Sequence, residues 1–85
     1  MKLILYSKQG CWLCEGLLTK LQAVKKVVFE LEIRDITTSS DWFDRYQYEI
    51  PVLCVLNDRQ QEQELPRFPP RSPVTKLEEL LQRYQ

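Results

Sequence analysis

Two cysteines separated by two residues carry the strongest chemical signal in the sequence. Cys11 and Cys14 enclose Trp12 and Leu13. In a reducing compartment, a C-x-x-C pair is more typical of metal binding or redox chemistry than of a structural disulfide. The two sulfurs could alternate between a dithiol and an intramolecular disulfide, because one thiolate can displace whatever the other has captured. Thiol–disulfide exchange is therefore the first chemistry to consider.

The position of the pair favours Cys11 as the attacking sulfur. It stands just before a predicted helix, where unpaired N–H groups and the positive end of the helix dipole stabilise a thiolate. Cys14 lies one turn into that helix and is expected to be shielded but within reach of Cys11. Lys8, upstream of the pair, adds positive charge that favours a thiolate, whereas Glu15, just downstream, adds negative charge that opposes it. We predict Cys11 as the catalytic thiolate and Cys14 as the resolving thiol.

The same cysteines could instead hold a metal or simply pack. Zinc prefers four Cys or His ligands, and the chain has three cysteines and no histidine. A zinc site within one chain would need a carboxylate as a ligand, so we predict no metal site. The alternatives for Cys11 and Cys14 are a metal shared across a dimer and a role in packing alone. Cys54 lies within an apolar run and is predicted to be a buried, inert thiol, with a role as an extra resolving cysteine as the alternative.

Composition narrows the classes of function. The 85 residues suffice for one domain, predicted to span 1–85, and 44% hydrophobic with 28% charged residues is typical of globular proteins. A formal net charge of zero gives no reason to expect nucleic acid or a membrane surface as a partner. The absence of histidine excludes Ser-His-Asp and Cys-His catalysis. The first residues match neither a secretory signal nor a membrane-spanning segment, so a cytoplasmic location is expected. The protein is also expected to be a monomer.

The elements that must position the pair begin with a short apolar run. Residues 3–6 predict a strand covered on both faces. A helix is predicted over 15–26, with one apolar face and Lys25 and Lys26 at its C-terminal end. Residues 27–34 alternate apolar and charged side chains, which predicts a half-exposed edge strand.

The sequence pattern in the second half of the chain predicts four further elements and two connections. A short helix through Trp42, Phe43 and Tyr46 takes its N-cap from residues 37–40 and ends before Pro51. Residues 52–56 predict a central strand, followed by a tight turn at 57–58, a polar return strand over 60–65 and a stiff connector over 67–73. A last helix is predicted to open with Ser72 as N-cap and Pro73 as its first residue, with capping-box spacing between Thr75 and Glu78. The order is strand, helix, strand, helix, strand, strand, helix.

This order predicts an α/β fold with a mixed four-stranded sheet and three flanking helices. The first strand-helix-strand unit implies a right-handed parallel crossover. The later pair of strands implies a hairpin. Such a sheet places the C-x-x-C pair at the end of its first strand.

Two motifs give the chain a resemblance to a known group. Residues 6–14, Tyr-Ser-Lys-Gln-Gly-Cys-Trp-Leu-Cys, follow the first strand, and Ile50-Pro51 precedes the third. The chain resembles glutaredoxin-type members of the thioredoxin superfamily, especially the short glutaredoxin-like proteins of bacteria. The resemblance implies a thioredoxin-like fold of order βαβαββα. It further implies that Pro51 is a cis-proline facing the cysteines, that Ile50 lends its backbone to a substrate, and that Lys8 is the family's basic residue.

The chain departs from glutaredoxins at two places. Trp12-Leu13 replaces the usual Pro-Tyr between the cysteines. Residues 65–70 contain no glycine where glutaredoxins have a Gly-Gly pair that holds glutathione, and a proline has no N–H to offer such a site.

These features together predict a small thiol–disulfide oxidoreductase. We expect Lys8, Trp12, Leu13, Ile50 and Pro51 to contact substrate. The expected partner is a disulfide-containing protein or a glutathione mixed disulfide. No cofactor is expected, and glutathione stays open as a co-substrate. The alternatives are a non-catalytic thioredoxin-fold binding module and a dimer that bridges an iron–sulfur cluster through Cys11.

Overall fold

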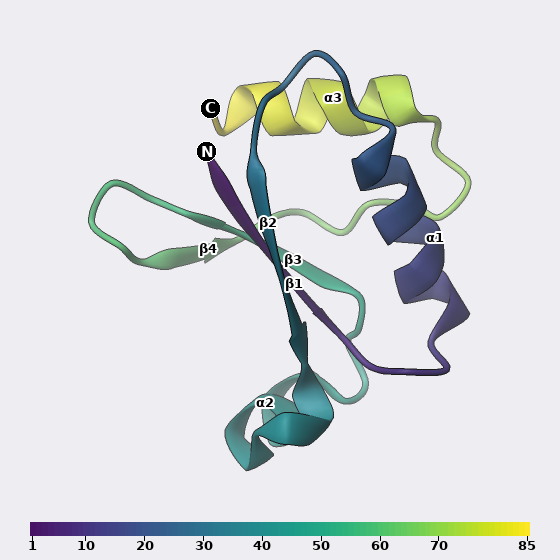
Figure 1. Cartoon of the computed structure of the whole chain (residues 1–85), viewed down its shortest axis with the longest axis vertical. Helices are drawn as coiled ribbons and strands as arrows, with labels where there is room; N and C mark the ends of the chain where they lie inside the picture. The colour runs from purple at the N-terminus through teal and green to yellow at the C-terminus, as the bar shows by residue number, and fades with distance from the viewer.

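The computed structural model describes all 85 residues and contains one four-stranded mixed sheet. The strand order is β2-β1-β3-β4, with β1 parallel to β2 and antiparallel to β3, and β3 antiparallel to β4 (Figure 1). The strands are β1 (Lys2–Ser7), β2 (Glu30–Asp35), β3 (Val52–Leu56) and β4 (Glu62–Glu64). The predicted mixed four-stranded sheet, its hairpin and the order of the elements along the chain are confirmed.

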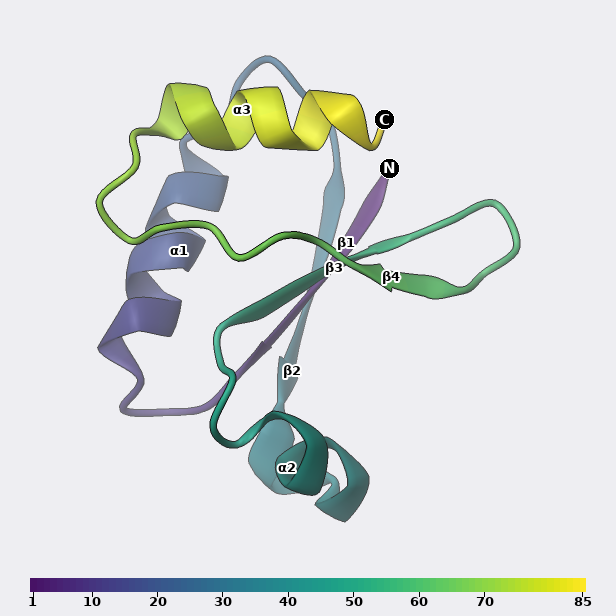
Figure 2. The same cartoon turned by 180° about the vertical axis from the view of Figure 1, so that it is seen from behind.

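Three helices flank the sheet, as predicted. Helices α1 and α3 lie together on one face, whereas α2 lies at one end of the molecule, close to the carboxyl ends of β1 and β2 (Figures 1 and 2). The helices are α1 (Trp12–Gln22), α2 (Ser40–Tyr46) and α3 (Val74–Arg83), and a short 3-10 helix, η1 (Ile36–Thr38), precedes α2. Ser39 caps α2 through its side chain, in the region where the N-cap was predicted.

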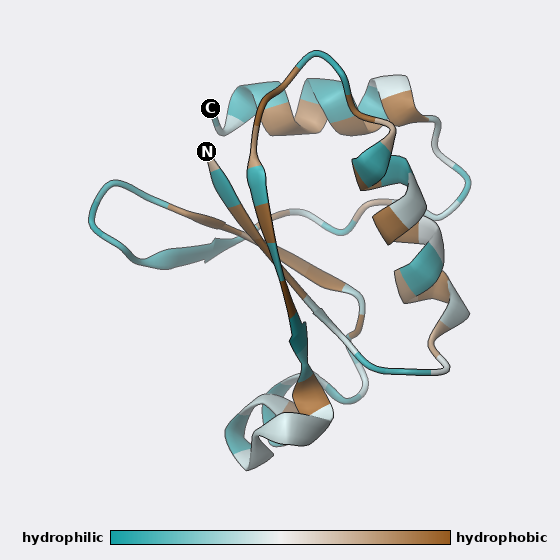
Figure 3. Cartoon of the chain, in the orientation of Figure 1, coloured by the Kyte–Doolittle hydropathy of each residue, from teal (hydrophilic) through white to brown (hydrophobic).

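The two faces of the sheet bury two separate apolar clusters. The larger cluster has ten buried residues between the sheet and helices α1 and α3, and the smaller has six buried residues beneath η1 and α2. Leu3 and Leu5 belong to the larger cluster, and Ile4 and Tyr6 to the smaller, because successive strand residues point to opposite faces. Figure 3 shows the hydrophobic stretches of β1, β3 and the inward sides of α1 and α3.

Helix α1 begins and ends earlier than predicted. It spans Trp12–Gln22 rather than 15–26, and Cys11 is its N-cap. Lys25 and Lys26 therefore lie beyond the helix and do not complement its dipole. Their backbone N–H groups instead donate to Glu78 Oε2, each over 2.9 Å, so the segment after α1 is anchored to α3.

The start of α3 also differs from the prediction. The helix begins at Val74, Pro73 occupies the N-cap, and no side chain caps the helix. The predicted capping box between Thr75 and Glu78 is wrong, because the Glu78 carboxylate accepts the two N–H groups from the segment after α1. A sequence pattern cannot show that a distant loop competes for the same carboxylate.

Both outer strands are shorter than predicted. Strand β2 begins at Glu30 rather than at residue 27, and β4 covers only Glu62–Glu64. The edge position predicted for β2 is confirmed by the strand order. The predicted tight turn is a longer loop in which Asn57 Oδ1 accepts N–H groups from Arg59 and Gln61, both over 2.9 Å.

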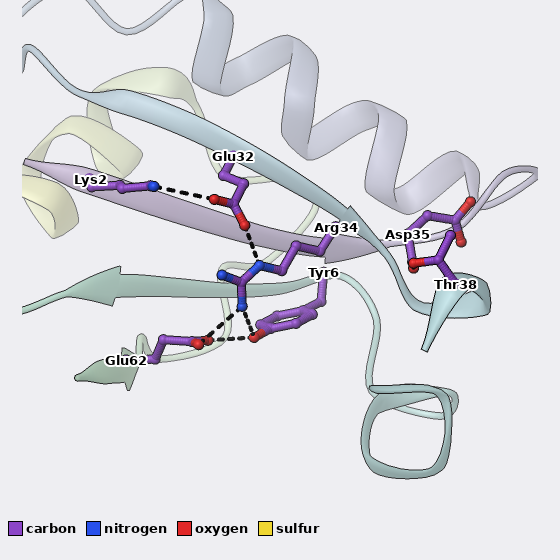
Figure 4. A network of polar contacts seen from close by, with 7 residues as sticks. All are labelled: Lys2, Tyr6, Glu32, Arg34, Asp35, Thr38 and Glu62. Atoms are coloured by element: carbon purple, nitrogen blue, oxygen red, sulfur yellow. Dashed lines mark hydrogen bonds and ion pairs between the residues drawn. The ribbon is translucent and has the colours of Figure 1, made fainter. Parts of the chain in front are cut away.

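A polar network covers the sheet face that α1 and α3 leave open (Figure 4). Arg34 forms ion pairs with Glu32 and, at 3.1 Å, with Glu62. Its Nη1 donates to the Tyr6 hydroxyl over 2.8 Å, and that hydroxyl donates to Glu62. Lys2 pairs with Glu32 at 3.2 Å. Burial and the neighbouring Glu62 raise the pKa of Tyr6 to about 12, so the hydroxyl keeps its proton and links β1 to β4.

Candidate functional site

The Cys11 sulfur lies against the first amides of α1. Cys11 is the N-cap of the helix, and its Sγ accepts a hydrogen bond from the Cys14 N–H over 3.2 Å. Cys11 and Cys14 form a disulfide, with their Cα atoms 5.3 Å apart. The structure therefore places both sulfurs as the sequence predicted, with the first of them at the positive end of the helix.

A short loop carries the chain from the buried strand β1 to this N-cap. Gly10 has a φ of +81°, in the left-handed region that favours glycine. The Cys11 N–H then donates back to the Lys8 carbonyl over 3.3 Å. This tight turn brings Cys11 to the helix start with its side chain aimed at the amides.

The two sulfurs differ in exposure. Cys14 is 3% exposed and buried, whereas Cys11 is half-buried. Trp12, beside Cys11, is 77% exposed. Reagents in solution therefore reach the pair from the side of Cys11 and Trp12.

Strand pairing brings Pro51 to the same end of the sheet. Tyr6, near the end of β1, pairs with Val52 at the start of β3, so residues 50 and 51 lie next to the turn that leads to Cys11. The Ile50–Pro51 peptide bond is cis, as the resemblance implied. Pro51, Trp12 and Leu13 all line one pocket of about 150 Å³.

Two of the residues predicted to contact substrate lie outside this pocket. Lys8 contributes its carbonyl to the turn, and its side chain is exposed. Ile50 packs against the smaller core cluster, and its N–H donates to the Tyr46 carbonyl over 3.1 Å. The expectation that the backbone groups of Ile50 are free to pair with a bound chain is therefore wrong for its N–H.

The other wall of the pocket was not predicted from the sequence. It comes from α1 and from the connector that leaves β4 and runs past α1 to α3 (Figure 2). The signal that could have found it is the proline-rich composition of the connector, which keeps that segment extended. The additional lining residues are Gly16, Leu17, Lys20, Val52, Leu53, Glu64, Leu65, Pro66, Arg67, Phe68 and Pro70.

Two cationic side chains hold the connector in place. Lys20 Nζ donates to the carbonyl of Ser72 over 2.8 Å and to that of Pro70, and it lies 5.5 Å from the centre of the Phe68 ring. Arg67 Nη1 donates to the Glu49 carbonyl over 2.9 Å. Both side chains thus help to fix the pocket wall.

The third cysteine does not join the pair. Cys54 is 2% exposed and belongs to the smaller core cluster, on the sheet face opposite α1. Burial raises the pKa of its thiol to about 11, with Glu62 and Glu64 adding to the shift. The structure contains no group of three or more Cys, Asp or Glu side chains placed to hold a metal ion.

Comparisons with known proteins agree with this architecture. Thioredoxin 1 from the thermophilic eubacterium Thermosipho africanus TCF52B has a similar structure, with a TM-score of 0.65 and 20% sequence identity over 99% of this chain and 93% of that one. At this identity the likeness concerns the fold, which is thioredoxin-like. No curated protein matches the sequence. None of the helices is long and apolar enough to cross a membrane. The family model described as Glutaredoxin-like domain (DUF836) matches residues 2–84, and the chain belongs to that family.

Proposed function

We propose that the protein is a small thiol–disulfide oxidoreductase that acts as a cytoplasmic monomer. The observation that carries this proposal is the hydrogen bond from the Cys14 N–H to the Cys11 sulfur at the helix N-terminus. A thiolate at the same place would accept the same N–H and face the positive end of the α1 dipole. The thioredoxin-like fold and the family match support redox chemistry in general terms.

The first step is attack by the Cys11 thiolate on one sulfur of a substrate disulfide. A new bond forms between Cys11 and that sulfur, the substrate S–S bond breaks, and the other sulfur leaves as a thiolate that takes a proton from solvent. Cys11 suits this step because it is the more exposed of the two cysteines.

The second step releases the substrate. Cys14 loses its proton, its thiolate attacks the Cys11 sulfur, and the captured sulfur leaves as a thiolate. The substrate has then gained two electrons, and the protein holds the Cys11–Cys14 disulfide. The 5.3 Å separation of the two Cα atoms lies within the usual range for disulfides, so the fold accommodates the product of this step. A thiol reductant must then restore the dithiol.

The proposal is tested by turnover and by trapping. The protein should reduce bis(2-hydroxyethyl) disulfide with dithiothreitol as the reductant, and its dithiol should have a reduction potential between about −150 and −280 mV. Cys11→Ser should abolish turnover. Cys14→Ser should lower turnover and, when dithiothreitol is left out, should accumulate a mixed disulfide at Cys11, observable by mass spectrometry. Cys54→Ala is the control and should keep turnover.

Other outcomes would identify the alternatives. A folded protein that forms no mixed disulfide at Cys11 would contradict the proposal and leave the non-catalytic binding module. Brown, freshly purified protein that loses its colour with Cys11→Ser would instead show the cluster-bridged dimer.

A further inference from the structure

A second pocket lies on the sheet face opposite α1, between α2 and the strands β1, β3 and β4. It has a volume of about 300 Å³ and shares only Glu64 with the pocket beside Pro51. Its walls carry three aromatic rings, from Tyr6, Trp42 and Tyr46, together with three carboxylates. The cysteine pair and its neighbours therefore take no part in this pocket.

The lining of the second pocket carries negative charge that the fold leaves unpaired. Its carboxylates are those of Asp41, Glu62 and Glu64, and its one cationic group is the guanidinium of Arg45. Glu62 pairs with Arg34 at 3.1 Å (Figure 4). Asp41 and Glu64 belong to no ion pair, so two carboxylates remain for a ligand.

A buried thiol without a hydrogen-bond partner also lines the second pocket. Cys54 is only 2% exposed, and it reaches the pocket from β3. After burial, Glu62 and Glu64 make the largest contributions to the raised pKa of this thiol, so the pocket carries a negative potential at its buried side. A cation is favoured there, and an ammonium N–H can donate to the thiol sulfur, which is a weak acceptor.

The aromatic walls already attract one cation. Arg45 is exposed and belongs to no ion pair, and its guanidinium carbon lies 5.3 Å from the centre of the Tyr46 ring. The quadrupole of the ring attracts cations to its face. Because no ion pair holds Arg45 in place, a ligand cation can displace it toward solvent.

These groups indicate an organic cation rather than a metal ion. The structure contains no group of three or more Cys, Asp or Glu side chains placed to hold a metal. Two unpaired carboxylates match two ammonium groups, and the aromatic rings offer apolar surface for the carbon chain that joins them. A volume of about 300 Å³ is at the lower end of the range for small-molecule sites.

We propose that the second pocket binds a small aliphatic diamine, whose ammonium groups pair with Asp41 and Glu64. Its carbon chain would lie against the rings of Trp42 and Tyr46. The inference goes beyond the oxidoreductase function proposed above and does not depend on it, because neither Cys11 nor Cys14 takes part.

The test follows the two tryptophan side chains of the oxidised, ¹⁵N-labelled protein by NMR. Trp42 lines the second pocket, whereas Trp12 does not, so their indole N–H signals report on the site and on a region outside it. Titration with 1,4-diaminobutane at constant pH and ionic strength should shift the Trp42 signal saturably and leave the Trp12 signal in place. 1-Aminobutane, with a single charge, should bind about 3-fold or more weakly.

Substitutions identify the charges that bind the diamine. Asp41→Asn and Glu64→Gln should each weaken binding by about 3- to 5-fold, the value of one partly exposed ion pair. Arg45→Gln should tighten binding, because it removes a like charge and frees the Tyr46 ring. Asp44→Asn is the matched control, since Asp44 is exposed on α2 outside the pocket, and it should bind as the unsubstituted protein does. The NMR spectrum of each variant shows whether it is folded.

Three results would overturn the diamine site. The first is a Trp42 signal that does not shift saturably with 1,4-diaminobutane. The second is an equal effect of 1-aminobutane or magnesium chloride at the same ionic strength, which would show only a general response to cations. The third is equal weakening by Asp44→Asn and Asp41→Asn. None of them affects the proposed function, which is tested by turnover at Cys11.

Discussion

At the residue scale, the two glycines of the chain have opposite effects on stability. Gly10 has a φ of +81° in the turn before Cys11, whereas Gly16 lies in α1, and an added Cβ meets no atom within 4 Å at either position. Steric crowding is therefore absent from both, and only the backbone conformation distinguishes them.

Gly10→Ala should lower the free energy of unfolding by about 1–2 kcal/mol, because an L-residue is disfavoured in the left-handed region. Gly16→Ala should raise it by about 0.5–1 kcal/mol, because alanine is the better helix former. Urea unfolding of the two variants beside the unsubstituted protein measures both changes. Destabilisation by Gly16→Ala would contradict the description of that site as open.

The buried thiol of Cys54 makes stability depend on alkaline pH. Its pKa of about 11 in the folded protein exceeds the ordinary value of 9.0. The folded state therefore holds this proton where the unfolded state has lost it. The resulting stabilisation is fully present below about pH 9 and is lost as pH rises toward about 11.

Cys54→Val should remove this part of the alkaline destabilisation. A shift of this size corresponds to a few kcal/mol at most. The measurement is urea unfolding at pH 8, 9, 10 and 11. The free energy of unfolding of the variant is compared with that of the unsubstituted protein at each pH, so that contributions common to both proteins cancel. Parallel pH profiles would show that Cys54 titrates normally.

At the element scale, one carboxylate joins α3 to the segment that follows α1. Glu78 accepts the backbone N–H groups of Lys25 and Lys26, and these hydrogen bonds lower the pKa of its carboxyl group. A lowered pKa stabilises the folded state above the unfolded-state pKa, and this stabilisation is lost as pH falls through the folded-state value.

Glu78→Gln should therefore lower the melting temperature at pH 7 and weaken its dependence on pH below about 4.5, the ordinary pKa of the carboxyl. The measurement is a series of thermal unfolding curves between pH 2.5 and 7. Glu79→Gln is the control, because Glu79 is exposed and pairs only with Lys76, at 3.4 Å. Equal effects of the two substitutions would argue against the anchoring role of Glu78.

At the scale of the whole molecule, the two core clusters contribute unequally. The larger has ten buried residues and joins the sheet to α1 and α3, whereas the smaller has six and depends on η1 and α2. A domain of this size has a total stability of only about 5–10 kcal/mol, so loss of one large side chain from the larger cluster removes a substantial part of it.

Leu77→Ala should lower the free energy of unfolding by about 2–5 kcal/mol, because Leu77 is a fully buried member of the larger cluster. Leu80→Ala, on the same helix and only partly buried, should cost less. Urea unfolding followed by circular dichroism compares the two variants. A smaller loss for Leu77 than for Leu80 would contradict the assignment of the core.

The sequence by itself determined the central strands, the order of the elements and the C-x-x-C motif at the start of a helix. These features depend on local periodicity and on neighbouring residues, which a sequence displays directly. It also indicated that Cys14 would be shielded, because it lies one turn into the helix, and that Cys54 would be buried, because it lies within an apolar run.

Only the tertiary structure decided where distant segments meet. The end of α1 and the role of Glu78 depend on hydrogen bonds between residues more than 50 positions apart. The pocket wall likewise depends on the connector packing against α1 through Lys20. Such contacts form only when the chain folds. In the sequence, many polar groups could pair with the Glu78 carboxylate or the Lys20 ammonium group, and only the folded structure determines which of them lie within hydrogen-bond distance.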